Sequence, residues 1–256
     1  MTLLEFTGCS LLGFGPAFSM FVLTVAGEPS RVIVFVTAAF FWLLSLLTAS
    51  LVWLALVPLR QYTAPGVAMV VLSQISLRRL VQEVFRLLFF RVLRKAERVL
   101  NAVALAGADE AARMRSRLAF AYTSGLAFGT MGGLFSLLGP LSDALGPGTP
   151  GLMSGAPPRL LAASALTAAA FSVLHVCWAL VSFNGLDTRR WTSLAFAPVA
   201  HAAASAATLL APRADYAVSL GSFGGLLLVS AALAFQAAGG SAGNIWAALS
   251  KRDTKE

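Results

Sequence analysis

Charged residues are scarce in this sequence, at 12% of 256 residues, and there are only two histidines and two cysteines. Hydrophobic residues make up 58% of the chain, and its mean hydropathy of +0.79 lies above the range of ordinary soluble domains. The shortage of charge argues against a soluble globular domain. It indicates a protein that spends most of its length in a membrane.

Aspartate is missing from every long apolar segment, since all five lie in connections or the tail: Asp109, Asp143, Asp187, Asp215 and Asp253. A paired-aspartate mechanism inside the membrane therefore has no candidates in this chain. There is no His-Glu-x-x-His pattern, and two histidines with two distant cysteines supply a zinc site poorly. We expect no catalytic residue, no metal site and no cofactor. Cys9 and Cys177 lie in apolar segments and are expected to pack as small hydrophobes without a disulfide.

Seven apolar segments are long enough to cross a bilayer, which takes about 20 residues. They are 3–26, 32–59, 64–90, 118–138, 160–183, 191–210 and 216–238. Most connections are short, so we expect one all-α transmembrane domain, a bundle of seven helices over residues 1–256. The charged stretch 91–117 is expected to be an aqueous loop and 239–256 a tail. The first segment has no basic region before it and is expected to be a retained span.

Basic residues are concentrated on alternate connections. Of the 19 Lys and Arg residues, thirteen lie on one set of loops and the tail, three on the opposite set and three within segment 64–90. The positive-inside rule places the richer set in the cytosol, so the N-terminus is expected to be lumenal or extracellular and the C-terminus cytosolic. These loop charges beside anionic lipid account for the net charge of +8 without a nucleic-acid partner.

The two histidines are the sharpest polar signal within the apolar segments. His175 lies near the middle of segment 160–183 and His201 near the middle of segment 191–210, so both rings are expected at similar depth. One interpretation is structural, with interhelical hydrogen bonds worth about 0.6 kcal/mol each. The other is a polar pocket that receives a partner or relays protons. A serine nucleophile at Ser172, three residues before His175, is a weaker alternative.

Glycines recur every four residues in segment 118–138, at Gly125, Gly129 and Gly133. This spacing puts them on one helical stripe and predicts a seam where another helix approaches closely, in this chain or in a partner. We expect Gly129→Leu to weaken assembly with partners while leaving membrane insertion intact.

Segment 64–90 carries polar residues at a high cost, about 2.5–3.5 kcal/mol for each charge at the bilayer centre. Glu83 lies four residues after Arg79 and three before Arg86, so its carboxylate can pair with either guanidinium along one face. We expect Arg78 and Arg86 to extend toward cytosolic phosphates. Glu83 is expected to face the protein interior or a partner.

Taken together, these motifs resemble the anterior-pharynx-defective (Aph) subunit family of γ-secretase. The resembling stretches are Gly8-Cys9, Phe14-Gly15-Pro16-Ala17-Phe18, Thr24-Val25-Ala26-Gly27, Phe40-Phe41-Trp42-Leu43, Gln82-Glu83-Val84-Phe85-Arg86, Tyr122 through Gly133, Asp143-Ala144-Leu145-Gly146-Pro147-Gly148, Leu174-His175 with Trp178, His201, and Ala238-Gly239-Gly240-Ser241. They are spread over nearly the whole chain, and the ordered set is more specific than any one of them.

The resemblance implies a non-catalytic scaffold of seven spans that binds nicastrin, presenilin and the presenilin enhancer. Presenilin supplies the two catalytic aspartates, and the complex cleaves type I membrane proteins such as Notch and the amyloid precursor protein. It also implies a multi-pass protein of the endoplasmic reticulum, Golgi, plasma membrane and endosomes. Gly125, Gly129 and Gly133 match the family's glycine motif for assembly, and His175 and His201 match its two intramembrane histidines, which support presenilin association.

The sequence departs from the family pattern in two places. Arg78 and Arg79 stand where uncharged residues are expected, which bears on the packing and depth of segment 64–90, and the alanine-rich stretch 101–112 has no clear likeness. A seven-helix receptor and a proton-coupled transporter using His175, His201 and Glu83 remain as alternatives. No Asp-Arg-Tyr-like triplet supports the first, and no internal repeat supports the second.

Overall fold

A computed structural model of the chain describes residues 3–61, 67–104, 110–145, 159–209, 216–241 and 243. Within these ranges the chain forms seven α-helices and no strand, so the predicted all-α class is confirmed. The helices are α1 (Leu3–Thr24), α2 (Pro29–Gln61), α3 (Val67–Ala104), α4 (Glu110–Leu145), α5 (Leu160–Thr188), α6 (Trp191–Ala207) and α7 (Tyr216–Ala237).

Five of these helices are long and apolar enough to cross a membrane by themselves: α1, α2, α4, α5 and α7. Two of the seven predicted spans do not meet that standard in the described residues. Helix α6 has only 17 residues, and α3 carries Arg78, Arg79, Glu83 and Arg86 along its length. The crossing of α3 and α6, and the orientation of the bundle, stay predictions.

The stretch 91–117 differs from the loop expected from its charges. Its first part forms the last turns of α3, which continues to Ala104, and its last part forms the first turns of α4, which begins at Glu110. Arg, Lys, Glu and Ala are good helix formers, so charge alone does not end a helix. Helices α3 and α4 therefore extend well beyond the apolar segments they contain.

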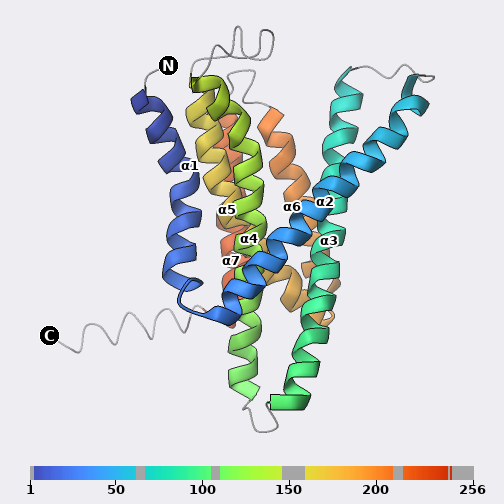
Figure 1. The fold of residues 1–256 in the computed structure, drawn as a ribbon, viewed down its shortest axis with the longest axis vertical. Coiled ribbons are helices and arrows are strands. Elements are labelled where there is room, and N and C mark those ends of the chain that lie inside the picture. Colours follow the sequence, from blue (N-terminus) through green and yellow to red (C-terminus); the bar gives the residue numbers. More distant parts are fainter. Residues whose placement is uncertain are drawn as a thin grey trace, which may run out of the picture.

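Helix α5 is the centre of the bundle and packs against α1, α4, α6 and α7 (Figure 1). Sixteen of its residues are buried, on all sides of the helix, which is the pattern of a core helix rather than an amphipathic one. Helix α2 crosses the bundle obliquely and packs against α3 and α4, and α3 also meets α6 (Figure 1). These contacts bring α3, α5 and α6 close to one another.

Apolar side chains also cover the outside of the bundle. On α2 the exposed ones follow each other at intervals of three or four residues: Ile33, Val36, Phe40, Leu43, Leu47, Leu51 and Leu54. Such a surface is suited to lipid or to another helix rather than to water. Cys9 and Cys177 are both free and lie in separate apolar clusters, as expected for small hydrophobes.

Candidate functional site

Three neighbouring polar residues of α3 face the protein interior. Gln82, Glu83 and Arg86 are 3%, 7% and 2% exposed, whereas Leu80, Val84 and Leu87 on the outward side are exposed. Residues three and four apart share a face of a helix, which is why 82, 83 and 86 turn inward together. In this part of α3 the charged groups of Glu83 and Arg86 therefore face the protein, and the apolar residues face the surroundings.

Four side chains from three helices form a continuous hydrogen-bonded chain, which we call the buried polar cluster: His175, Arg86, Glu83 and His201. Arg86 Nη1 lies 3.1 Å from Glu83 Oε2, and Arg86 Nη2 lies 2.6 Å from His175 Nδ1. His201 Nδ1 lies 2.7 Å from the other carboxylate oxygen of Glu83. The cluster closes on itself, because the two imidazole rings stand 4.9 Å apart and nearly perpendicular.

The partners of the two imidazoles determine where their protons lie. A guanidinium can only donate, so Nδ1 of His175 accepts from Arg86, and its proton is on Nε2. An ionised carboxylate can only accept, so Nδ1 of His201 donates to Glu83. The two rings therefore hold opposite tautomers.

Aromatic rings enclose the buried polar cluster. Trp178 lies 4.8 Å from His201 and 5.2 Å from His175 between ring centroids, and Phe171 lies 6.2 Å from each imidazole. Trp178 also donates its Nε1–H to Ser230 on α7, at 3.2 Å. These rings surround the charges with apolar groups, which strengthens the electrostatic contacts among them.

Arg86 corrects one expectation from the sequence. It does not extend toward an interface, because its side chain is almost fully buried between Glu83 and His175. Arg78 is exposed, and its extension toward cytosolic phosphates stays a prediction. Arg79 forms no ion pair with Glu83 among the described residues. Instead it donates to Gln82 at 3.3 Å, and its guanidinium carbon lies 5.5 Å from the centre of the Phe171 ring.

A cavity of about 330 Å³ borders the cluster, lined by Arg79, Gly132, Phe171, His175 and Thr208 among others. Five buried nitrogens have no hydrogen-bond partner among the described residues: Nε1 of Trp42, Nε of Arg79, Nε2 of Gln82, Nε of Arg86 and Nε2 of His201. Of these residues, Arg79 also lines the cavity, which has room for water beside Arg79 and His175.

The predicted glycine stripe of α4 lies against α5, directly beside the cluster. A Cβ atom on Gly125 would fall 2.7 Å from the carbonyl oxygen of His175, and one on Gly129 would fall 2.6 Å from that of Ser172. A Cβ on Gly133 would meet nothing closer than 3.4 Å. The absence of side chains at 125 and 129 is thus what lets the backbone of α5 approach.

The alternatives with a reactive serine or a metal find no support in this geometry. The Ser172 hydroxyl donates to the carbonyl oxygens of Ala168 and Gly129, at 3.1 and 3.4 Å, and not to an imidazole. Among the described residues no group of three His, Cys, Asp or Glu side chains gathers in a way that could hold a metal ion.

The sequence predicted part of this cluster. The expected pair of Glu83 with Arg86 is present, whereas the expected pair with Arg79 is not. The contacts of Arg86 with His175 and of Glu83 with His201 were not predicted. The sequence did contain a reason to expect the contact between Glu83 and His201. A carboxylate in hydrocarbon needs more than one partner, and the two histidines are ionisable groups expected within the apolar segments.

Comparison with known proteins agrees with the resemblance over nearly the full chain. The model of the Aph-1 protein family matches residues 4–241. The chain is 38% identical over 241 residues to a protein of Drosophila melanogaster named gamma-secretase subunit Aph-1, covering 94% of this chain and 95% of the relative. It is 37% identical over 254 residues to gamma-secretase subunit Aph-1b of Danio rerio, covering 99% and 96%. It is 35% identical over 242 residues to gamma-secretase subunit APH-1B of Homo sapiens, covering 94% and 91%.

Proposed function

The chain belongs to the Aph-1 protein family, and on that premise we propose that it is the non-catalytic scaffold and assembly subunit of a γ-secretase complex. Its partners in this proposal are nicastrin, presenilin and the presenilin enhancer. Presenilin supplies the aspartates that cleave type I membrane proteins, including Notch and the amyloid precursor protein. The complex acts in the endoplasmic reticulum, Golgi, plasma membrane and endosomes.

The observation that carries the proposal is the closed arrangement of the buried polar cluster. The Glu83 carboxylate, which has two oxygens to offer, bonds Arg86 with one and His201 with the other. The polar groups of the cluster are thereby bonded to one another and hold α3, α5 and α6 together. A general acid or nucleophile must instead reach a substrate. Mutual pairing favours a role in fixing helix positions.

The exposed stripe of α2 supports the same role from the outside. Its apolar residues at intervals of three and four form a seam of the kind that receives another helix. Helix α2 packs against both α3 and α4. The buried polar cluster positions α3 and the glycine stripe positions α4, so together they determine the position of the α2 stripe. We propose that partner helices dock on α2.

The proposal is tested by expressing the tagged chain in cells that lack their own Aph subunit and purifying it in a mild detergent. We expect nicastrin and presenilin fragments to be recovered in the eluate, together with restored cleavage of a type I membrane substrate. Good insertion of the chain with neither partner in the eluate would contradict the proposal.

One observation favours a second candidate, a proton-coupled transporter. The cavity of about 330 Å³ reaches His175 and Arg79, which places titratable and charged groups beside an open space. A transporter predicts pH-driven uptake by the purified chain in liposomes, whereas a scaffold predicts none. A proton flux that disappears in Glu83→Gln would favour the transporter.

A further inference from the structure

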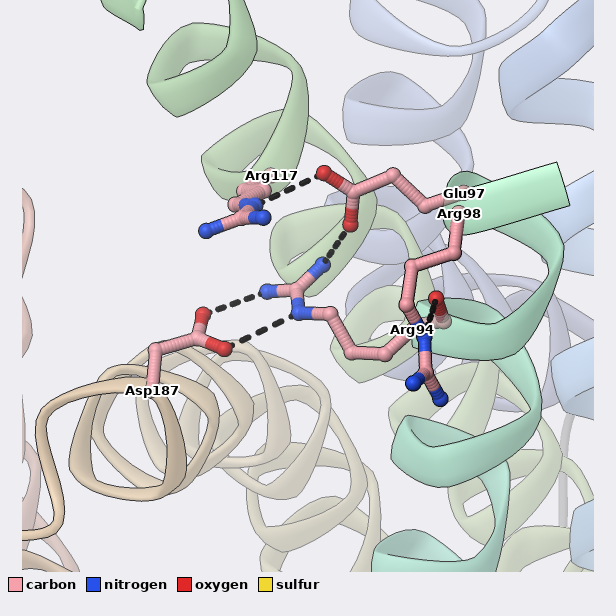
Figure 2. A network of polar contacts seen from close by, with 5 residues as sticks. All are labelled: Arg94, Glu97, Arg98, Arg117 and Asp187. Carbon is pink, nitrogen blue, oxygen red and sulfur yellow. Dashed lines mark hydrogen bonds and ion pairs between the residues drawn. The ribbon is translucent and has the colours of Figure 1, made fainter. Parts of the chain in front are cut away.

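A second polar network joins α3, α4 and α5 at the end of the bundle where the chain passes from α3 to α4 (Figures 1 and 2). Arg94 holds Asp187 of α5 with two hydrogen bonds, of 3.0 and 2.6 Å. Glu97 accepts from Arg94 at 3.0 Å and from Arg117 of α4 at 2.7 Å. Figure 2 shows Arg94 between the two carboxylates, so its guanidinium is held in one position.

This network borders a cavity of about 420 Å³, within the range of about 300–1,000 Å³ that is typical of small-molecule sites. Arg94, Arg113, Arg117 and Asn184 line it toward the helix ends. Ala121 and Leu180, further along α4 and α5, line it toward the middle of the bundle. The cavity is therefore polar at the helix ends and apolar in its depth.

Arginines outnumber carboxylates among the described residues that line the cavity. Three arginines line the cavity, against the two carboxylates of the network, Glu97 and Asp187. Arg113 is exposed and forms no ion pair among the described residues. A guanidinium presents a planar set of donors that matches phosphate oxygens, and it stays charged at any physiological pH.

We propose that this cavity binds the phosphate headgroup of an anionic phospholipid, with the start of an acyl chain along Ala121 and Leu180. Basic pockets between transmembrane helices at the cytosolic side are suited to such headgroups. The inference rests on the predicted orientation, which puts this end of the bundle in the cytosol, and not on the assembly of the chain with protein partners. An acidic protein segment would meet the same charges but would not need the apolar depth.

The chain offers a matched pair of variants. Arg113→Gln removes the cavity's unpaired cation, and Arg115→Gln removes the same charge two residues away. Arg115 is exposed on α4 and does not line the cavity, since two residues turn a helix by about 200°. Both positions are exposed, so neither change disturbs packing.

The test is native mass spectrometry of the purified full chain in detergent, titrated with phosphatidylserine or phosphatidylcholine. We expect phosphatidylserine to bind more tightly than phosphatidylcholine, and Arg113→Gln to weaken phosphatidylserine about five-fold. Arg115→Gln should leave binding unchanged. Competition by soluble glycerophosphoserine would show that the headgroup alone suffices; no competition would show that the acyl chain is needed as well.

Two results would overturn the proposal. Equal weakening by both variants would mean that surface charge, and not the cavity, attracts the lipid. Equal binding of phosphatidylserine and phosphatidylcholine would contradict a site for an anionic headgroup, since the two lipids share the phosphate and differ in net charge. Recovery of nicastrin and presenilin fragments is measured on the same variants. Lost recovery in Arg113→Gln with unchanged lipid binding would make the cavity a protein-docking site, whereas wild-type protein that recovers neither partner speaks against the proposed function alone.

Discussion

At the scale of single residues, Glu83 decides whether the buried polar cluster is stable. An ionised carboxylate inside a bundle is costly unless its oxygens are bonded, and Glu83 is bonded on one side by Arg86 and on the other by His201. Removing it would leave Arg86 without its counter-charge and His201 without an acceptor. The two imidazoles themselves meet only through ring contact.

We therefore expect Glu83→Ala to lower the free energy of unfolding by about 3–5 kcal/mol, the cost of breaking a buried ion pair. Ser230→Ala is the control, because it removes one buried hydrogen bond, from Trp178, and should cost about 0.6–1.7 kcal/mol. Unfolding by SDS titration of the purified chain, followed by tryptophan fluorescence, measures both. Similar losses for the two variants would mean that the cluster is not an ion-paired unit.

Substitutions of Arg79 and Arg86 should have very different effects on the free energy of unfolding, although both residues lie on α3. Arg79 has a buried Nε without a partner in the described residues and makes one hydrogen bond with a neutral side chain. We expect Arg79→Met to be neutral or stabilising, because it removes a poorly compensated charge. Arg86→Met should cost about 3–5 kcal/mol for the reason that applies to Glu83. The same SDS titration tests this order, and a larger loss at Arg79 would reverse it.

At the scale of elements, the seam between α4 and α5 is what places His175. The spacing left open whether the glycine stripe meets a helix of this chain or of a partner, and it faces α5 of its own chain. A bulky residue at Gly129 would push α5 away and move His175 from Arg86. Any loss of partner assembly in Gly129→Leu would then arise from displaced helices inside this subunit and not from a blocked contact between subunits.

Alanine substitutions of glycines test the seam by position. Gly129→Ala should destabilise the chain by about 1–3 kcal/mol, because the new methyl group would meet the backbone at Ser172. Gly224→Ala on α7 is the control, since nothing lies within 4 Å of a Cβ there and alanine favours helix. Thermal unfolding in detergent separates them. Equal melting temperatures would show that α4 and α5 do not pack as closely as described.

At the scale of the whole molecule, the surface that we propose for partner helices lies on α2 and not on the core helices. Phe40 and Leu47 are more than half exposed and belong to the α2 stripe. On α7, Leu228 and Phe235 are also exposed and provide the same pair of residue types. Lipid covers both surfaces equally well, so only a partner helix distinguishes them.

We expect the double variant Phe40→Ala with Leu47→Ala to reduce recovery of presenilin fragments or nicastrin at least several-fold. The double variant Leu228→Ala with Phe235→Ala should leave recovery unchanged. Both sets of side chains are exposed, so the lone chain should fold in either case, as gel filtration can verify. Full recovery with the α2 variant would place the partner surface elsewhere.

Sequence alone determined the all-α class and the seven helices, and it singled out His175, His201 and Glu83 as polar residues of apolar segments. These follow from local properties: the length of each apolar run and the cost of charge in hydrocarbon. It also allowed the family to be recognised from motifs in their order. Much of the charged stretch 91–117, which was expected to be a loop, is helical. Charged residues favour contact with water, but they do not end a helix.

Only the tertiary structure decided the connections. Arg86 meets His175 across 89 residues of chain and Glu83 meets His201 across 118, and no spacing within one helix specifies such contacts. The same holds for the glycine seam, whose stripe was visible but whose neighbour was not. The physical reason is that a sequence pattern determines which face of a helix carries polar residues or glycines. Which other helix packs against that face depends on how all seven helices pack together.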